Sequence, residues 1–101
     1  MPDVNESLDA IAKALAEEFT GYAVEQFQSS EDKRRESVTF EVGHDRHRYL
    51  FTFTHEFLHD VTADLRAETV KSLRREVEGC ADAQVLVRSH GPLEFISRSE
   101  E

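Results

Sequence analysis

Residues 38–53, VTFEVGHDRHRYLFTF, are the stretch that decides the fold. Large apolar side chains stand at every second position on both sides of a polar centre: Val38, Phe40, Val42, Tyr49, Phe51 and Phe53. A period of two is typical of strands that bury one face, because successive side chains of a strand point to opposite sides. The segment Gly43-His44-Asp45-Arg46 between the two runs suits a hairpin turn. We therefore predict a β-hairpin with one buried face.

The part of the chain before the hairpin predicts a helix, a strand and a loop. Apolar residues repeat there at helical spacing: Leu8, Ile11, Leu15 and Phe19. Gly21 follows them and can end a helix, because glycine tolerates the left-handed conformation found there. We expect a helix over residues 4–19, a strand over 22–28 (YAVEQFQ) and a polar loop over 29–36 (SSEDKRRE).

A second helix and two short strands are expected after the hairpin. The apolar residues of this helix form one stripe: Leu65, Val70, Leu73 and Val77. Gly79 can end the helix. Residues 84–88 (QVLVR) and 93–96 (LEFI) read as short strands, joined by a turn at 89–92 (SHGP).

The order of elements is α-β-β-β-α-β-β, which predicts an α+β fold. We expect an antiparallel sheet with two helices packed on one face, since one layer of helices covers one apolar sheet face. Its core should contain Phe40, Phe51, Phe53 and Leu73. A chain of 101 residues forms one domain, 1–101, with a single modest core. We expect about 4–97 to be ordered and the ends to be flexible.

The composition of the chain limits which partners it is expected to bind and in which cellular compartment it is expected. The chain has 21 Asp and Glu against 12 Lys and Arg, a net charge of −9. Such a chain repels phosphate groups at long range, so nucleic acid and anionic membranes are not expected partners. The single Cys80 cannot form an internal disulfide, and no apolar run approaches the ~18 residues that span a bilayer. The first ten residues lack the basic and apolar regions of a signal peptide. We expect a cytoplasmic protein.

The five residues His55-Glu56-Phe57-Leu58-His59 resemble the H-E-x-x-H motif of zinc peptidases. In that family the two histidines bind zinc and the glutamate acts as the general base, which implies His55 and His59 as ligands. Histidines four residues apart can share a metal on a helix, where they lie about 6 Å apart, but not on a strand. The pattern predicts a short helical turn here, a break near residues 62–63, and a separate main helix.

A third zinc ligand is hard to find in the sequence. The longer form of the motif has Gly at position 62 and His at 65, where this chain has Thr62 and Leu65. In the form with a downstream glutamate, Glu76 and Glu78 are the candidates, about 18 Å along the helix from its start. We therefore interpret HEFLH as a junction between strand and helix, with Phe57 and Leu58 buried and both histidines at the surface.

A basic segment leaves nucleic-acid binding open as an alternative. The middle of the chain gathers five cations that could form a patch: Lys33, Arg34, Arg35, Arg46 and Arg48. The order α-β-β-β-α resembles the double-stranded-RNA-binding fold, although residues 59–64 (HDVTAD) are acidic where that fold has a basic helix start. With the last two strands included, the order also resembles that of type III secretion chaperones, which are small, acidic and usually dimeric. Both resemblances rest on topology alone.

We interpret the chain as a small acidic, non-catalytic interaction or regulatory domain that binds a protein partner or itself. We predict no catalytic residue, no metal and no cofactor. The alternatives are a zinc-dependent hydrolase that uses His55 and His59, and an RNA-binding module with a basic loop. Four apolar residues lie out of phase with the main apolar face and could form a dimer surface: Tyr22, Leu50, Leu86 and Ile96.

Overall fold

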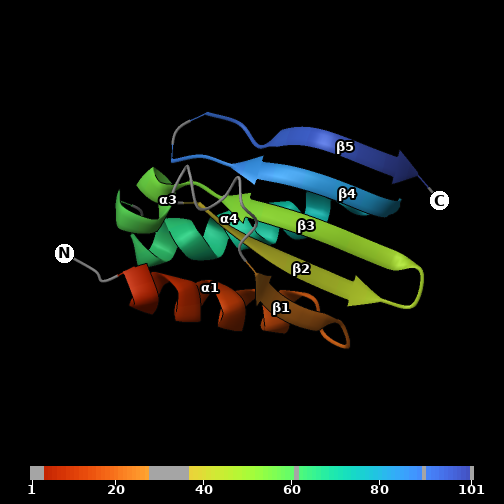
Figure 1. Cartoon of the computed structure of the whole chain (residues 1–101), viewed down its shortest axis with the longest axis horizontal. Helices are drawn as coiled ribbons and strands as arrows, with labels where there is room; N and C mark the ends of the chain where they lie inside the picture. The colour runs from red at the N-terminus through yellow and green to blue at the C-terminus, as the bar shows by residue number, and fades with distance from the viewer. Residues whose placement is uncertain (1–3, 28–36, 61, 90, 101) are drawn as a thin grey trace.

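The computed structural model describes residues 4–27, 37–60, 62–89 and 91–100, and it has an α+β fold (Figure 1). The elements are α1 (Val4–Glu18), β1 (Ala23–Phe27), β2 (Val38–His44), β3 (His47–Phe53), α3 (His55–Asp60), α4 (Ala63–Glu76), β4 (Cys80–Val87) and β5 (Glu94–Glu100). The predicted α+β class and the order of the main elements are confirmed. The polar loop predicted over 29–36 lies outside the described residues.

The sheet has five strands in the order β1-β2-β3-β4-β5, and it is mixed rather than purely antiparallel. Neighbouring strands are antiparallel except β3 and β4, which run parallel, with Phe51 opposite Val85. The predicted all-antiparallel sheet is therefore wrong. The physical reason is the connection: α3 and α4 carry the chain from the end of β3 back to its beginning, and such a helical crossover makes the next strand parallel.

Two helices, α1 and α4, pack side by side against one face of the sheet, as predicted. Among the described residues, the short α3 is a third helix, and it lies at one end of the molecule (Figure 1). A separate helix begins at Ala63 because Thr62 caps it: its backbone is extended, and its side chain accepts a hydrogen bond from the Leu65 amide. The predicted break near residues 62–63 is confirmed.

The hairpin that decides the fold has the predicted buried face, and its turn is shorter than the predicted 43–46, because β2 and β3 pair as far as His44 and His47. Phe40 lies opposite Phe51, and the strands are joined at Asp45, which has a left-handed φ of 53° that aspartate tolerates in turns. The large side chains that are fully buried include Phe40, Phe51, Phe53 and Leu73, which confirms the predicted core. Their burial between sheet and helices is the main stabilising contribution.

Two apolar residues lie where the sequence pattern did not place them. Leu65 was predicted in the stripe with Val70, yet it is 45% exposed while Val70 is fully buried. Five residues of helix turn the side chain by about 140°, so the two cannot face the same side. Tyr22 was expected on a second surface, but its ring packs against Phe19, with centroids 5.6 Å apart, and against Tyr49.

The last two strands are longer than predicted. β4 begins at Cys80 rather than at residue 84, and β5 continues to Glu100 rather than ending at residue 96. The ladder between them includes polar pairs such as Asp82 with Ser99, and it contains register shifts typical of β-bulges. Backbone pairing sustains these strand ends without an apolar pattern, which is why periodicity missed them.

The sheet face opposite the helices is mostly polar. Thr39 and Thr52 lie opposite each other there, with their hydroxyl oxygens 2.8 Å apart. Leu50 and Leu86 lie on the same face and are half-buried. Ile96 is 54% exposed on β5. These leucines and Ile96 therefore lie away from the helical core, as expected, and the dimer that would cover them stays a prediction.

Candidate functional site

The HEFLH residues form α3, and the end of β3 positions them. Thr54 links strand and helix: its amide donates to the carbonyl of Val87, 3.1 Å away, and its side chain accepts a hydrogen bond from the Phe57 amide at 3.3 Å. These bonds tie the start of α3 to β4 and cap the helix. Phe57 and Leu58 are buried at this junction, as predicted.

A buried hydroxyl fixes the other end of α3. Ser7 of α1 is 1% exposed and donates to the carbonyl of Leu58 at 2.8 Å. Its oxygen also accepts a hydrogen bond from Arg66 of α4 at 3.2 Å. The carbonyl of Leu58 belongs to the last turn of α3, where carbonyls have no partner within the helix. Ser7 therefore connects α1, α3 and α4, the three helices of the described residues.

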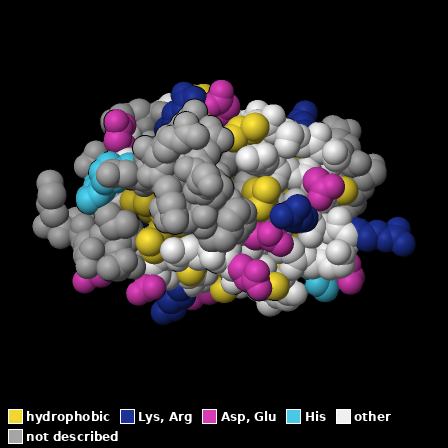
Figure 2. Space-filling model, in the orientation of Figure 1, with side chains coloured by type: hydrophobic (Ala, Val, Ile, Leu, Met, Phe, Trp, Pro, Cys, Tyr) yellow, Lys and Arg dark blue, Asp and Glu magenta, His cyan; other side chains and the backbone are white. Residues whose placement is uncertain are grey.

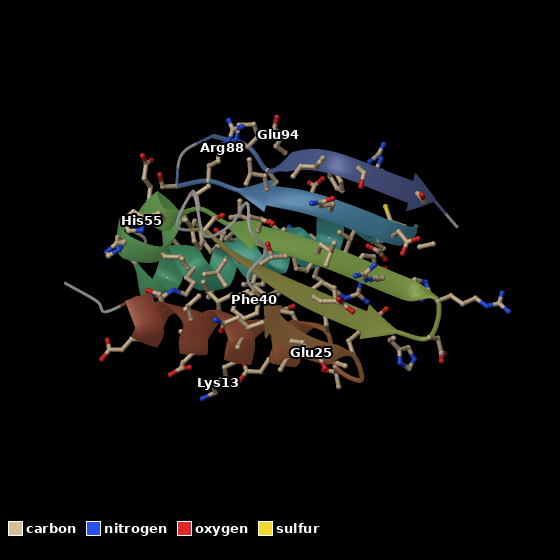
Figure 3. The ribbon with its side chains drawn as sticks, in the orientation of Figure 1. Lys13, Glu25, Phe40, His55, Arg88 and Glu94 are labelled. Carbon is tan, nitrogen blue, oxygen red and sulfur yellow. The ribbon has the colours of Figure 1, made fainter. Side chains whose placement is uncertain are left out.

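His55 and His59 face the same side of α3, as the helical spacing predicts. Their ring centroids are 4.1 Å apart and the rings are tilted by 59°. Both side chains are half-buried rather than fully at the surface, and His55 lies at one end of the molecule (Figure 3). Glu56 is exposed, and its carboxylate accepts a hydrogen bond from the Ser89 hydroxyl at 3.4 Å.

The described residues do not assemble a catalytic zinc site. Among them, no group of three His, Cys, Asp or Glu side chains is placed to hold a metal ion. His44 and His47 lie at the β2–β3 turn, which is at the opposite end of a molecule 40 Å long (Figure 1). His90 lies outside the described residues. Among the described residues, the resemblance to zinc peptidases therefore extends no further than residues 55–59 of α3.

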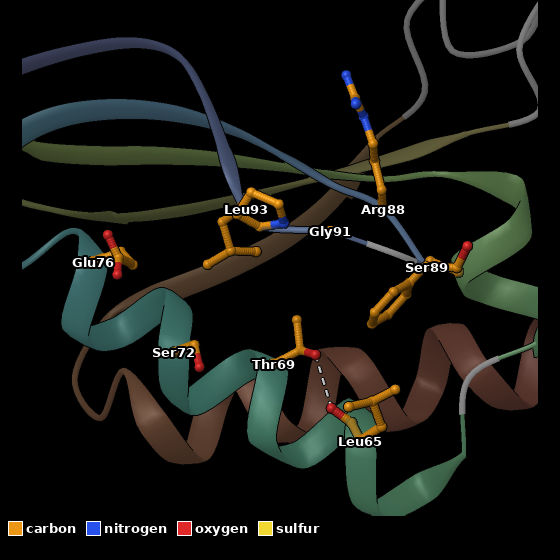
Figure 4. A pocket seen from close by; sticks show the side chains of 10 residues that line it. Leu65, Thr69, Ser72, Glu76, Arg88, Ser89, Gly91 and Leu93 are labelled. Atoms are coloured by element: carbon orange, nitrogen blue, oxygen red, sulfur yellow. Dashed lines mark hydrogen bonds between the residues drawn. The ribbon is translucent and has the colours of Figure 1, made fainter.

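A groove runs beside α3, between α4 and the turn that joins β4 to β5 (Figure 4). We call it the α4 groove, and its volume is about 450 Å³. Its lining residues come from three segments: Phe57, Leu65, Thr69, Ser72, Glu76, Arg88, Ser89, Gly91, Pro92 and Leu93. The residues from α4 form one row along the helix, which faces Leu93 and the turn (Figure 4).

The α4 groove exists because the helices cover only part of the sheet. α4 lies behind the middle strands, and no described helix lies behind β5 (Figure 1). The sequence pattern does not predict this groove. One signal was present: Leu65 is rotated by about 140° from Val70 around the helix, which separates it from the core stripe.

A second hollow, of about 300 Å³, lies at the β2–β3 turn. Its lining includes His44 and His47 together with Glu25 and Glu41. The imidazole of His44 is 3.5 Å from the Asp45 carboxylate, and its ring packs on Tyr22 with centroids 5.3 Å apart. These contacts are those of a packed strand end, and the hollow is smaller than the α4 groove.

Two reactive side chains are shielded in the core beside this end. Burial, and secondarily its neighbour Tyr22, raises the pKa of Tyr49 to about 12. The Tyr49 hydroxyl donates to the carbonyl of Cys80 at 2.7 Å. Cys80 itself is 4% exposed, so its thiol is a packing group rather than an accessible nucleophile.

The predicted basic patch is not assembled from the described residues. Lys33, Arg34 and Arg35 lie outside them. Arg48 pairs with Glu41 at 3.2 Å, and Arg46 is exposed at the turn. Over the face shown in Figure 2, acidic and basic side chains are interspersed rather than separated into one basic surface.

Comparison with known proteins indicates no function for the chain, so the functional argument rests on the α4 groove and the pair His55 and His59. In the described part of the chain, no helix is long and apolar enough to cross a membrane. No family model matches the chain, no curated protein matches its sequence, and no solved structure matches its fold.

Proposed function

We propose that the chain is a protein-interaction domain that binds an extended peptide segment of a partner along the α4 groove. The observation that carries the proposal is the exposure of Leu65, 45%, on the wall of a groove of about 450 Å³. This volume is in the range of ligand pockets, about 300–1,000 Å³. Covering the exposed part of one leucine contributes about 1 kcal/mol, so Leu65 can anchor a partner's apolar side chain.

The apolar end of the groove lies where α3, α4 and the β4–β5 turn meet. Phe57 of α3 is buried and Leu65 of α4 is exposed, and both line the groove. Leu93 is half-buried and faces Ser72, farther along α4 (Figure 4). An apolar side chain bound here would cover the exposed part of Leu65 and displace water from it. Interfaces commonly place such an anchor in a pocket that the partner fills.

The far end of the groove is acidic. Glu76 is the charged lining residue at this end. The other charged lining residue, Arg88, lies beside Ser89, away from Glu76 (Figure 4), and forms an ion pair with Glu94. Glu76 is exposed, and none of the ion pairs among the described residues includes it. The net charge of −9 would also attract a basic segment at long range. The groove therefore favours a partner with Lys or Arg at this end.

The spacing of the two ends sets the spacing within the partner. Leu65 and Glu76 are separated by about 16 Å along α4, from the rise of 1.5 Å per helical residue. An extended peptide advances about 3.3 Å per residue and covers this length in about five residues. We expect a peptide with a large apolar residue and a basic residue about five positions apart.

Selection of random peptides displayed on phage tests this function. The purified chain should enrich peptides with the expected apolar and basic residues, and Leu65→Asp should abolish the enrichment. Ile96→Asp is the matched control, because Ile96 is also exposed, at 54%, but does not line the groove. Glu76→Lys should change the preference from basic to acidic peptides. Circular dichroism verifies that each variant is folded.

Two results would contradict the proposed function. One is an absence of enriched peptides on the folded chain. The other is enrichment that survives Leu65→Asp and is lost in Ile96→Asp, which would place binding on β5 instead. Enriched peptides that keep their basic residue on Glu76→Lys would refute the electrostatic part.

A further inference from the structure

The histidine pair of α3 is independent of the α4 groove, and its geometry points to a metal rather than a peptide. His55 and His59 bring two imidazole rings to a centroid separation of 4.1 Å. His55 projects from α3 at one end of the molecule (Figure 3), and His59 lies on the same side of this helix. Phe57, which lines the groove, is two residues from each of them and lies on the opposite side of the helix.

The rings are close to the separation that a shared metal needs. Zinc binds imidazole nitrogens at about 2.0–2.1 Å, so two rings on one tetrahedral ion have centroids about 5 Å apart. Side-chain rotation alone can increase the separation from 4.1 Å to this value, since both residues lie on one turn of helix. The spacing of four residues on α3 therefore suits chelation of one ion by His55 and His59.

His55 already has a further interaction in the chain besides its contact with His59. An imidazole carries two nitrogens with separate roles, so one nitrogen can bind a metal while the other keeps a contact. In metal sites the second nitrogen is commonly held in this way, which orients the ring.

One chain supplies only half of a tetrahedral site. Among the described residues, no third His, Cys, Asp or Glu joins His55 and His59 to make a metal-binding group. A second copy related by a two-fold axis through the ion would supply the same two histidines and complete four nitrogen ligands. We propose that two copies of this chain bind one Zn²⁺ between their α3 helices, through His55 and His59 of each copy.

Electrostatics makes this association depend on zinc. Each chain has a net charge of −9, so two chains repel each other. Glu56, next to His55, is exposed and adds a negative charge on the same short helix. A divalent cation offsets this repulsion where the two helices meet, and the four metal bonds hold them together. Without zinc, the repulsion between the two chains is not offset, and we expect the two α3 helices not to associate.

Sedimentation of the purified chain, first stripped with a chelator and then titrated with zinc, tests the inference. Without zinc, we expect no dimer to form through the α3 contact. With zinc, we expect the mass to double and one ion to bind per two chains. His59→Ala should abolish both the doubling and the binding. His44→Ala is the matched control, because His44 is exposed at the opposite end of the molecule, and it should behave as the unchanged chain.

Three results would overturn the inference: no zinc binding, one zinc per chain without a change of mass, or zinc-dependent dimers that persist in His59→Ala. His55→Gln provides a second variant should His59→Ala not fold, and it should have the same effect. Leu65→Asp should leave the zinc-dependent dimer intact, so failure of the groove and failure of the metal site give different results.

Discussion

Replacing Ser7 with alanine removes the hydroxyl that links the three helices. Ser7 is 1% exposed, and its oxygen donates to the carbonyl of Leu58 in α3 and accepts a hydrogen bond from Arg66 in α4. The substitution leaves the carbonyl of Leu58 without this partner in a position that water does not reach freely. We expect Ser7→Ala to destabilise the chain and to loosen α3.

The magnitude follows from three contributions. A buried carbonyl that loses its hydrogen bond costs about 1–3 kcal/mol. The contact with Arg66, at 3.2 Å and partly buried, adds less than about 1 kcal/mol, because the guanidinium can turn to solvent. Alanine is the better helix former and returns about 0.5 kcal/mol. The net loss is about 2 kcal/mol, which for a domain of this size lowers Tm by roughly 10 °C.

Urea unfolding and thermal melting of Ser7→Ala measure this loss, and Thr69→Ala is the matched control. The Thr69 hydroxyl donates to the carbonyl of Leu65 at 2.8 Å, the same distance as in the Ser7 bond, but the Thr69 bond is exposed. Water replaces an exposed hydroxyl, so Thr69→Ala should change stability by less than about 0.5 kcal/mol. Equal effects of the two substitutions would refute the argument from burial.

Three further predictions concern the core and one helix cap. Phe51→Ala should lower the free energy of unfolding by about 3–5 kcal/mol, because Phe51 is fully buried. Leu50→Ala should lower it by only about 1 kcal/mol, because Leu50 is half-buried, and urea unfolding measures both changes. The pKa of Tyr49 is about 12 in the folded chain, against 10.0 when free. The free energy of unfolding should therefore be intact below pH 10 and fall by up to about 3 kcal/mol as the pH rises to about 12. In alkaline unfolding curves, Tyr49→Phe should not show this fall. Thr62→Ala removes the side-chain acceptor of the Leu65 amide, so it should cost about 1 kcal/mol and speed hydrogen exchange in the first turn of α4.

The candidate site could be predicted only in part. The spacing of His55 and His59 indicated two rings on one side of a helical turn, which the structure places 4.1 Å apart. The α4 groove could not be predicted, because its walls come from α4 and from the β4–β5 turn. Those segments meet only through the pairing of β4 with its neighbours. The exposure of Leu65 was available from its angle around the helix, since local geometry determines that angle.

Local patterns in the sequence determined the elements of this protein. The period of two over residues 38–53 indicates the hairpin and its buried face, because alternation along a strand is a property of the backbone itself. Likewise, the rotation of Val70 relative to Phe57 requires the helix to break near Thr62, since one straight helix cannot turn its apolar side.

Only the tertiary structure decided which strands are neighbours and in which direction they run. The pairing of β3 with β4 is parallel because a helical crossover joins strands that lie side by side, and this adjacency depends on packing across the whole core. The extension of β5 to Glu100 has the same origin, because backbone hydrogen bonds to β4 need no apolar side chains. The α4 groove also depends on that arrangement, since its lining combines residues of α4 with residues of the β4–β5 turn.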